Sequence, residues 1–414
     1  MANEEEYSFI EEEIMESKKP KRQMAANIKK AAVSGIVFGI MAGVCFSIVS
    51  YTFGKTAGDP SEEKIALVTS GEPATTNVSE TEIPQDKGSV DKKEPVHHDS
   101  ILDFHEEFAS IAKKSKRSLV GISLYSPEKE ESDTYNMSYV SSGIIVAKTQ
   151  KYLMILTKYS AMATEEVRVS FYDGTTVTGG VYRWDSDLDL AIVRIPLNKL
   201  LENTREKLKV IMMDMNAQAV VGDIVYALGN PNGKLFSAEY GYLTLDEEKK
   251  SIEDYMVDRY TTSMKYHNKG FGMICNRNGD MIGLIDTSKD DTENCTFYGI
   301  DKLQLIIENM LNGVEQCYSG IVATEIPAEM LLNHNLRTGI YVTAVQMDSP
   351  AYEAGVLVGD VITDLDGEPV NSIDGYFRAL QEHKVGDKVE VTVLRDAFGN
   401  QQKKKMKLKL AKRK

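Results

Sequence analysis

The feature that most constrains this chain is an uncharged apolar segment near its N-terminus. Residues 31–53 read AAVSGIVFGIMAGVCFSIVSYTF and contain no Asp, Glu, Lys or Arg. A helix of that length rises about 35 Å, which is enough to cross the hydrocarbon core of a bilayer. A helix buried in a soluble protein rarely carries apolar residues on every face over such a length. We therefore predict one transmembrane helix over residues 31–53.

Basic residues before this segment predict its orientation. Six Lys and Arg residues lie within residues 18–30, whereas the first charges after the segment are Lys55 and Asp59. The positive-inside rule then places residues 1–30 in the cytoplasm as a tail and residues 54–414 outside, in a single-pass protein of the cell membrane. A cleaved signal peptide explains the segment less well, because the apolar stretch is long and no A-x-A-like site follows closely.

Composition excludes several classes of protein. The 414 residues include 48 Lys and Arg against 62 Asp and Glu, for a formal charge of −14. Such a balance repels phosphate backbones, so we expect no nucleic-acid partner. Four cysteines in a chain of this length cannot form a dense disulfide framework. No CxxC, HExxH or paired Cys/His spacing occurs, so we expect no metal and no cofactor.

The rest of the chain divides into a tether and two folded units. Residues 54–100 are rich in Gly, Pro, Ser, Thr and charged residues, which predicts a flexible linker. A helical pattern begins near residue 100. Between about residues 118 and 296, short β-branched runs are separated by turn signals, which indicates a mainly β sandwich or barrel. A helix is predicted over 301–311. The last unit ends in KKKMKLKLAKRK, which predicts a strand with one solvated face and then a basic tail.

Two stretches of the C-terminal unit resemble one known domain. SPAYEAGVLVGDVITDLDGEPV (349–370) and YSGIVATEIPAEMLLNHNL (318–336) are similar to a PDZ domain of the bacterial HtrA type. The resemblance implies that a peptide's terminal carboxylate binds at the loop formed by Tyr318, Ser319, Gly320 and Ile321. The neighbouring strand edge would then pair with that peptide by β-augmentation. The alternative is that this unit only packs against its neighbouring domain.

Five earlier stretches extend the resemblance. They are SSGIIV (141–146), ILTKYSAM (155–162), DSDLDLAIVRI (185–195), VGDIVYALGNPNG (221–233) and TTSMKYHNKGFGMICNRNGDMIGLIDT (261–287). In order and spacing they resemble the trypsin-like domain of the HtrA/DegP/DegS serine protease family. The implied fold is a trypsin/chymotrypsin-like double β-barrel over 101–314 followed by a PDZ domain over 315–414. That layout, after one transmembrane helix, is typical of the family's membrane-anchored members. The protease domains of this family commonly trimerise. The resemblance therefore implies a homo-oligomer, or a hetero-oligomer with an active relative.

The residues that carry catalysis in that family are not all present. Hydrolysis by a Ser-His-Asp triad needs a nucleophile, a general base and an orienting carboxylate. Carried over one position at a time, the Asp falls on Asp189, the His on Ser160 and the nucleophilic Ser on Gly270. A serine hydroxyl cannot act as the general base, and glycine has no side chain. We therefore predict a degenerate triad in which only Asp189 matches the family.

The sequence offers little to replace the missing groups. Residues 264–286 contain no Ser, so a small shift in alignment supplies no nucleophile. Asn268 stands where the family has a glycine of the oxyanion hole, and Asn tolerates that backbone conformation less well. A Ser160–Lys269 dyad is one alternative, because Ser-Lys pairs act as catalysts elsewhere. A disulfide between Cys275 and Cys295 is an alternative to two free buried thiols.

Three functions fit these patterns. The first is a membrane-anchored, extracytoplasmic pseudoprotease that binds polypeptide C-termini or misfolded proteins through its PDZ domain, in protein quality control or scaffolding. The second is an active serine endopeptidase with an atypical catalytic set. The third is a transmembrane signalling adaptor whose cytoplasmic tail presents Tyr7 among acidic residues. We favour the first, without enzymatic activity, because the motifs of the fold are intact while Ser160 and Gly270 replace the catalytic pair.

Overall fold

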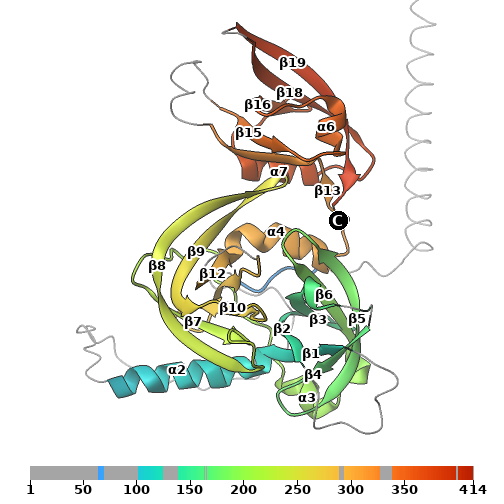
Figure 1. The fold of residues 1–414 in the computed structure, drawn as a ribbon. Helices are drawn as coiled ribbons and strands as arrows, with labels where there is room; N and C mark the ends of the chain where they lie inside the picture. The colour runs from blue at the N-terminus through green and yellow to red at the C-terminus, as the bar shows by residue number, and fades with distance from the viewer. Residues whose placement is uncertain are drawn as a thin grey trace, which may run out of the picture. The chain divides into compact units, whose positions relative to one another are not determined.

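The computed structural model describes residues 64–69, 101–124, 139–162, 164, 166–288, 293–326, 338–397 and 400–413 (Figure 1). The predicted tail (1–30) and transmembrane helix (31–53) lie outside these residues. No helix in the described ranges is both long and apolar enough to cross a membrane. The described part contains two β-barrels followed by a PDZ-like unit, so the mainly β fold predicted from the sequence is confirmed.

The first barrel contains strands that are buried on both faces. Its strands are β1 (Leu119–Leu124), β2 (Tyr139–Lys148), β3 (Tyr152–Lys158), β4 (Glu166–Ser170), β5 (Thr176–Asp185) and β6 (Leu190–Pro196), which close in the order β1-β2-β3-β6-β5-β4. In β3, Leu153 and Ile155 fill the barrel, whereas Met154 and Leu156 enter a second core shared with the other barrel. Successive side chains of a strand point to opposite faces, so a continuous apolar run serves both cores.

The second barrel repeats this plan. Its strands are β7 (Ile224–Gly229), β8 (Ser237–Ile252), β9 (Tyr255–Lys265), β10 (Gly272–Cys275), β11 (Met281–Ile285) and β12 (Asn294–Gly299), which close in the order β10-β11-β12-β9-β8-β7. Strands β8 and β9 pair out to Ile252 and Tyr255, so a two-residue turn of Glu253 and Asp254 joins them. Residue Asp254 adopts φ of 69° there, the left-handed conformation that tight hairpins require.

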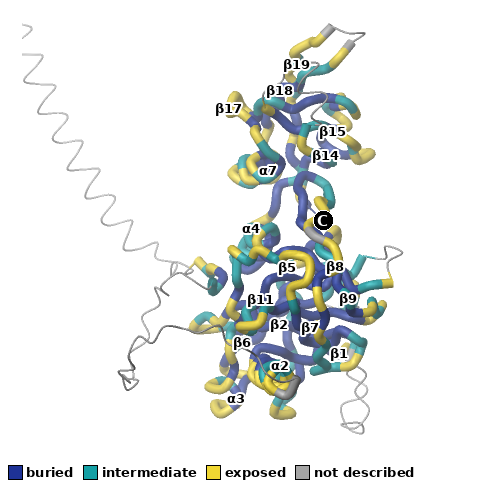
Figure 2. The backbone as a smooth tube through the Cα atoms, turned by 90° about the vertical axis from the view of Figure 1, so that its left-hand side faces the viewer, coloured by how far each residue is buried: buried dark blue, intermediate teal, exposed yellow. Residues whose placement is uncertain are grey.

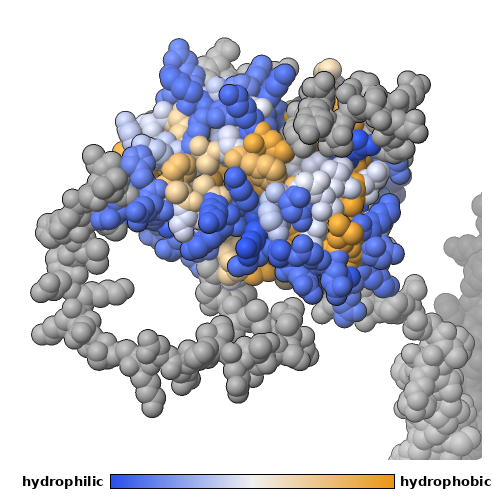
Figure 3. Space-filling view, turned by 90° about the horizontal axis from the view of Figure 1, so that it is seen from below, coloured by the Kyte–Doolittle hydropathy of each residue, from blue (hydrophilic) through white to orange (hydrophobic). Residues whose placement is uncertain are grey.

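Helices cover the barrels and link them to the last unit. They are α2 (Ile101–Ser115), η1 (Lys116–Ser118), η3 (Tyr159–Ala161), η4 (Leu197–Lys199), α3 (Glu202–Lys207) and α4 (Ile300–Leu311). The helix expected near residue 100 is α2, and Phe108 stacks on Tyr226 with ring centroids 5.4 Å apart. Figure 2 shows mostly buried barrel strands and an α2 that is largely exposed. Seen from the side on which α2 lies, apolar patches are interspersed with hydrophilic residues (Figure 3).

The last unit has its own sheet and core. Its elements are β13 (Cys317–Tyr318), β14 (Ile321–Glu325), β15 (Ile340–Val345), α6 (Pro350–Ala354), β16 (Val361–Leu365), β17 (Glu368–Pro369), α7 (Ile373–Gln381), β18 (Lys388–Ala397), β19 (Asn400–Lys409) and β20 (Ala411–Lys412). The sheet runs β14-β15-β16-β18-β19, so β14 is an edge strand. Ser349 caps α6 and Gly355, at φ of 82°, ends it, as the SPAYEAG motif dictates.

Two details differ from the sequence-based expectations, and a third decides between two alternatives. Residues 64–69, within the predicted tether, lie against α4, where Ile65 and Asn312 exchange two hydrogen bonds of 2.8 Å. The expected basic tail contains a buried Arg413, and β20 pairs with β13. Cys275 and Cys295 are buried free thiols, one of the two alternatives that the sequence left open. Each depends on partners distant in sequence, which local patterns do not reveal.

Candidate functional site

The predicted triad positions Ser160 and Asp189 lie in contact. Ser160 is in η3, directly after β3, and Asp189 precedes β6 with φ of 56°. Strands β3 and β6 pair side by side, and the Tyr159 N–H donates to the Asp189 carbonyl at 3.0 Å. The Asp189 carboxylate accepts the Ser160 N–H at 2.5 Å and the Ser160 hydroxyl at 2.9 Å. Neighbouring strands therefore hold these two residues together.

The Asp189 carboxylate has further partners. It accepts the Thr287 hydroxyl at 2.8 Å, and the Lys158 ammonium lies 3.7 Å away. In a working triad the carboxylate orients an imidazole, which removes the proton from the nucleophile. Here the carboxylate instead accepts hydrogen bonds from the Ser160 and Thr287 hydroxyls. The arrangement joins the two barrels through Thr287 of the second and Asp189 of the first, and it has the form of a structural hydrogen-bond cluster.

Gly270, the third predicted position, lies in a closed turn. Its N–H donates to the His267 carbonyl at 2.7 Å, so this amide is used inside the turn. A Cβ built on Gly270 would lie 2.5 Å from the Pro231 carbonyl oxygen and 2.9 Å from the His267 carbonyl oxygen. Such contacts are closer than real Cβ atoms show, so a serine side chain does not fit on this backbone.

The GNPNG motif fills the space around that turn. Asn230 donates from Nδ2 to the Lys269 carbonyl at 2.9 Å, and its N–H donates to the Phe271 carbonyl at 2.9 Å. Its Oδ1 accepts the Ser142 N–H from the first barrel at 3.2 Å. Asn230 is buried, and its hydrogen bonds hold the turn against the barrel. The motif that most clearly marked the protease-like fold therefore packs the turn into a closed conformation.

The alternative catalytic groups are engaged elsewhere or exposed. His267 accepts the Lys269 N–H at Nδ1, 3.1 Å away, and its ring covers Gly233. Lys269 is exposed, and the Ser160 hydroxyl donates to Asp189. Burial raises the pKa of the Cys275 thiol, and raises that of Cys295 to about 12. Thiols with raised pKa values form little thiolate and react poorly as nucleophiles.

A metal centre also finds no support in the described ranges, where no group of three or more His, Cys, Asp or Glu residues is arranged to hold an ion.

The predicted peptide-binding loop is a tight turn between β13 and β14. Tyr318 ends β13, Gly320 has φ of 82°, and Ile321 begins β14. The backbone N–H groups of Ser319, Gly320 and Ile321 turn toward one point. A Cβ on Gly320 would lie 2.2 Å from the Ser349 Cβ, so this tight loop also needs glycine for space. Consecutive amides turned inward form a nest, which binds anions.

One carboxylate occupies this nest, and it belongs to the chain itself. Asp254 Oδ2 accepts the Ser319 N–H at 2.7 Å and the Gly320 N–H at 3.3 Å, and Oδ1 accepts the Ile321 N–H at 3.1 Å. The Ser319 hydroxyl also donates to Asp254, and it lies 2.8 Å from the Tyr376 hydroxyl of α7. Sequence reasoning missed Asp254. The only local signal was a hairpin turn between long strands, and its partner loop lies 65 positions later.

Comparisons with known proteins agree with this architecture. Residues 141–284 match the trypsin-like peptidase domain family, and residues 325–410 match the PDZ domain family. The chain is 27% identical over 310 residues to the serine protease Do-like HtrA of Bacillus subtilis, covering 69% of this chain and 67% of that relative. It is 25% identical over 266 residues to the periplasmic serine endoprotease DegP of Escherichia coli K12, covering 62% of this chain and 54% of DegP.

A similar fold occurs among solved structures. The HtrA-type protease AlgW with a tripeptide superposes with a TM-score of 0.52 at 20% identity, covering 74% of this chain and 97% of that one. AlgW with a decapeptide gives a TM-score of 0.51 at 20% identity, covering 74% and 99%.

Proposed function

We propose that this homologue of the HtrA and DegP serine proteases, which carries a trypsin-like peptidase domain followed by a PDZ domain, is a pseudoprotease. It binds polypeptide C-termini or misfolded chains through the PDZ domain without cutting them. The observation that carries the proposal is the nest of three N–H groups at Ser319, Gly320 and Ile321, which holds a carboxylate. PDZ domains recognise peptides by this kind of carboxylate capture together with addition of a strand.

The peptidase domain supports the proposal that bound chains are not cut. The Ser160 hydroxyl donates a hydrogen bond to Asp189, and Gly270 offers no side chain and no room for one. A single missing member of a triad costs several orders of magnitude in rate, and here two positions lack the required group. The similar AlgW structures contain a tripeptide or a decapeptide, which supports peptides as the ligand class.

The remaining parts of the proposal concern location and assembly. We place residues 31–53 across the cell membrane, residues 1–30 in the cytoplasm and the two domains outside, because six lysines and arginines lie within residues 18–30, whereas only Lys55 follows the apolar segment closely. Assembly as a trimer, or with an active relative, follows from the family resemblance alone. Work in protein quality control or scaffolding would use the PDZ domain to capture exposed chain ends.

The test uses the full chain purified in detergent. A fluorophosphonate probe and unfolded casein measure catalysis, with HtrA of Bacillus subtilis as the active control and Ser160→Ala as the matched variant. A pool of randomised decapeptides with free C-termini, compared with the same pool as C-terminal amides, measures binding. We expect no labelling, no cleavage, and binding only of the free acids.

Two results would contradict the proposal. Casein cleavage that disappears in Ser160→Ala would establish an endopeptidase with an atypical catalytic set. Failure of the free-acid pool to bind both the wild type and a variant whose peptide-binding loop is freed would remove peptide capture. That result would leave the adaptor hypothesis, which deletion of residues 2–17 then tests by loss of a cytoplasmic partner.

A further inference from the structure

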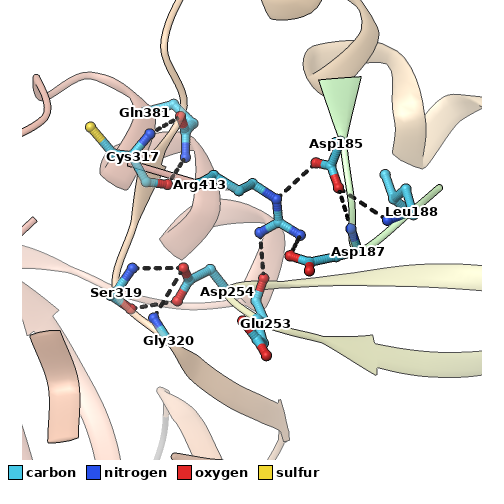
Figure 4. Close-up of polar contacts among 10 residues, drawn as sticks. All are labelled: Asp185, Asp187, Leu188, Glu253, Asp254, Cys317, Ser319, Gly320, Gln381 and Arg413. Carbon is cyan, nitrogen blue, oxygen red and sulfur yellow. Dashed lines mark hydrogen bonds and ion pairs between the residues drawn. The ribbon is translucent and has the colours of Figure 1, made fainter. Parts of the chain in front are cut away.

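The tip of the β8–β9 hairpin imitates a bound peptide. A peptide in a PDZ groove places its carboxylate in the N–H nest and adds its backbone to the edge strand. Asp254 supplies the carboxylate, and its own N–H donates to the Ile321 carbonyl at 2.6 Å. Glu253 forms an antiparallel bridge with Val322 of β14. Both elements of peptide recognition are thus satisfied by a turn of the second barrel (Figures 1 and 4).

This internal contact leaves no place for a second carboxylate. Asp254 is 2% exposed and Ser319 is fully buried. Burial raises the pKa of Asp254, and hydrogen bonds from Ser319 and Ile321 oppose that rise. The nest has already given its donors to Asp254, and two carboxylates in one buried site repel each other. Asp254 and the terminal carboxylate of an external polypeptide therefore exclude one another.

The penultimate side chain holds the hairpin in this position. Arg413 Nε lies 2.8 Å from Asp185 Oδ2, and one terminal nitrogen lies 2.8 Å from Asp187 Oδ2. The other terminal nitrogen donates to the Glu253 carbonyl at 2.9 Å, and the guanidinium lies 4.7 Å from the centroid of the Tyr255 ring. Figure 4 shows Arg413 between the two aspartates of the first barrel and the hairpin turn.

This clamp is specific to an arginine. A planar guanidinium reaches two carboxylates and a carbonyl at once, which a lysine ammonium cannot reproduce. The Arg413 N–H also donates to the Gln316 carbonyl at 2.9 Å, next to β13 and the nest. The end of the chain therefore ties together the first barrel, the hairpin and the segment that leads into the peptide-binding loop.

We propose that Asp254 is an internal ligand of the peptide-binding loop, clamped by Arg413, and that external C-termini bind only when the hairpin tip leaves. The inference rests on the proposed peptide-binding function and assigns its regulation. The site has a closed form, in which β14 pairs with Glu253, and an open form, in which β14 pairs with the peptide. Apparent affinity for a peptide equals the intrinsic affinity multiplied by the open fraction.

The test compares the full chain with two variants, using the free-acid decapeptide pool as probe and the amide pool as control. Asp254→Asn keeps the size of the side chain and removes its charge, whereas Arg413→Lys keeps the charge and removes the planar clamp. Asp366→Asn is the matched control, because Asp366 is an exposed turn aspartate of positive φ that lies in the PDZ unit outside the peptide-binding loop. We expect Asp254→Asn to bind free acids at least about tenfold more tightly, Arg413→Lys to gain less, and Asp366→Asn to equal the wild type.

Hydrogen exchange of the wild-type chain gives a readout that needs no variant. Peptide binding should raise exchange in a fragment that spans residues 250–258, because the Asp254 N–H loses its acceptor. Exchange over residues 318–322 should stay low, because the peptide replaces Asp254 as acceptor. Equal affinity of the wild type and Asp254→Asn, with unchanged exchange over 250–258, would overturn the internal ligand and leave peptide binding intact. Absence of binding in every variant would instead overturn the proposed function and this inference with it.

Discussion

The closed turn at Gly270 makes a quantitative prediction about stability. In Gly270→Ala the new Cβ would lie 2.5 Å from the Pro231 carbonyl oxygen, so the turn or the GNPNG segment must move. Overpacking of this kind costs about 1–3 kcal/mol. The movement also strains the hydrogen bonds from Gly270 to His267 and from Asn230 to Lys269, each worth about 1 kcal/mol. We expect a total loss of about 2–4 kcal/mol.

Gly180→Ala provides the matched control. Gly180 lies in β5 with nothing within 4 Å of the position of an added Cβ. Replacing a glycine by alanine without strain stabilises a protein by about 0.4–1 kcal/mol, because the unfolded chain loses conformational entropy. Urea and thermal unfolding of the full chain, followed by circular dichroism and by the fluorescence of the single tryptophan, Trp184, compare the variants. Gly270→Ala should lower the apparent midpoint by roughly 5–10 °C, and Gly180→Ala should not lower it.

The same geometry predicts that the triad cannot be restored by two substitutions. Ser160→His with Gly270→Ser supplies the missing side chains, yet the serine meets the Pro231 carbonyl and the Gly270 N–H remains bonded to His267. We expect no fluorophosphonate labelling of this double variant. Labelling comparable to that of an active relative, or a Gly270→Ala midpoint equal to that of Gly180→Ala, would refute the reasoning.

Two further predictions concern buried charges. Arg395 makes a bidentate contact with the buried Asp360 at 2.6 and 2.7 Å. Arg395→Met leaves this carboxylate without its partner and should destabilise the PDZ domain by about 3–5 kcal/mol in urea unfolding. A change of less than about 0.5 kcal/mol would contradict this prediction. Burial raises the pKa of Asp258 to about 6, although Lys302 opposes the rise. The folded state then binds the Asp258 proton more tightly than the unfolded state does. The resulting contribution to the free energy of unfolding is therefore complete below about pH 4 and is lost as the pH rises through about 6. Asp258→Asn should therefore flatten the pH dependence of stability between pH 4 and 7, and an unchanged slope would argue against the shift.

The order of elements was predictable because it follows from local patterns. Short β-branched runs separated by turn signals predict a mainly β sandwich or barrel, and the structure places these runs in two barrels with a shared core. The SPAYEAG segment carries its own cap, helix and terminating glycine, so its local conformation is specified within a few residues. The proximity of Ser160 and Asp189 was also predictable from the family resemblance. Ser160 follows β3 and Asp189 precedes β6, and these two strands are neighbours in the barrel.

The sequence could not predict that the turn at Gly270 and the peptide-binding loop are both closed. The sequence gives a glycine without a side chain at position 270, but only the packed Pro231 carbonyl shows that this backbone has no space for one. Likewise, YSGI predicts an anion-binding loop, whereas the identity of the anion depends on a hairpin 65 positions earlier.

By itself, the sequence determined the order of the two domains and the residue types at positions 160, 189 and 270, and its family resemblance predicted a carboxylate-binding loop, because each is a matter of residue type at a local position. Only the tertiary structure decided that Asp254 occupies the loop and that Arg413 clamps the hairpin. These contacts join residues 65 and 228 positions apart. Their geometry depends on how the second barrel, the PDZ domain and the last strand pack together, and no local pattern encodes that packing.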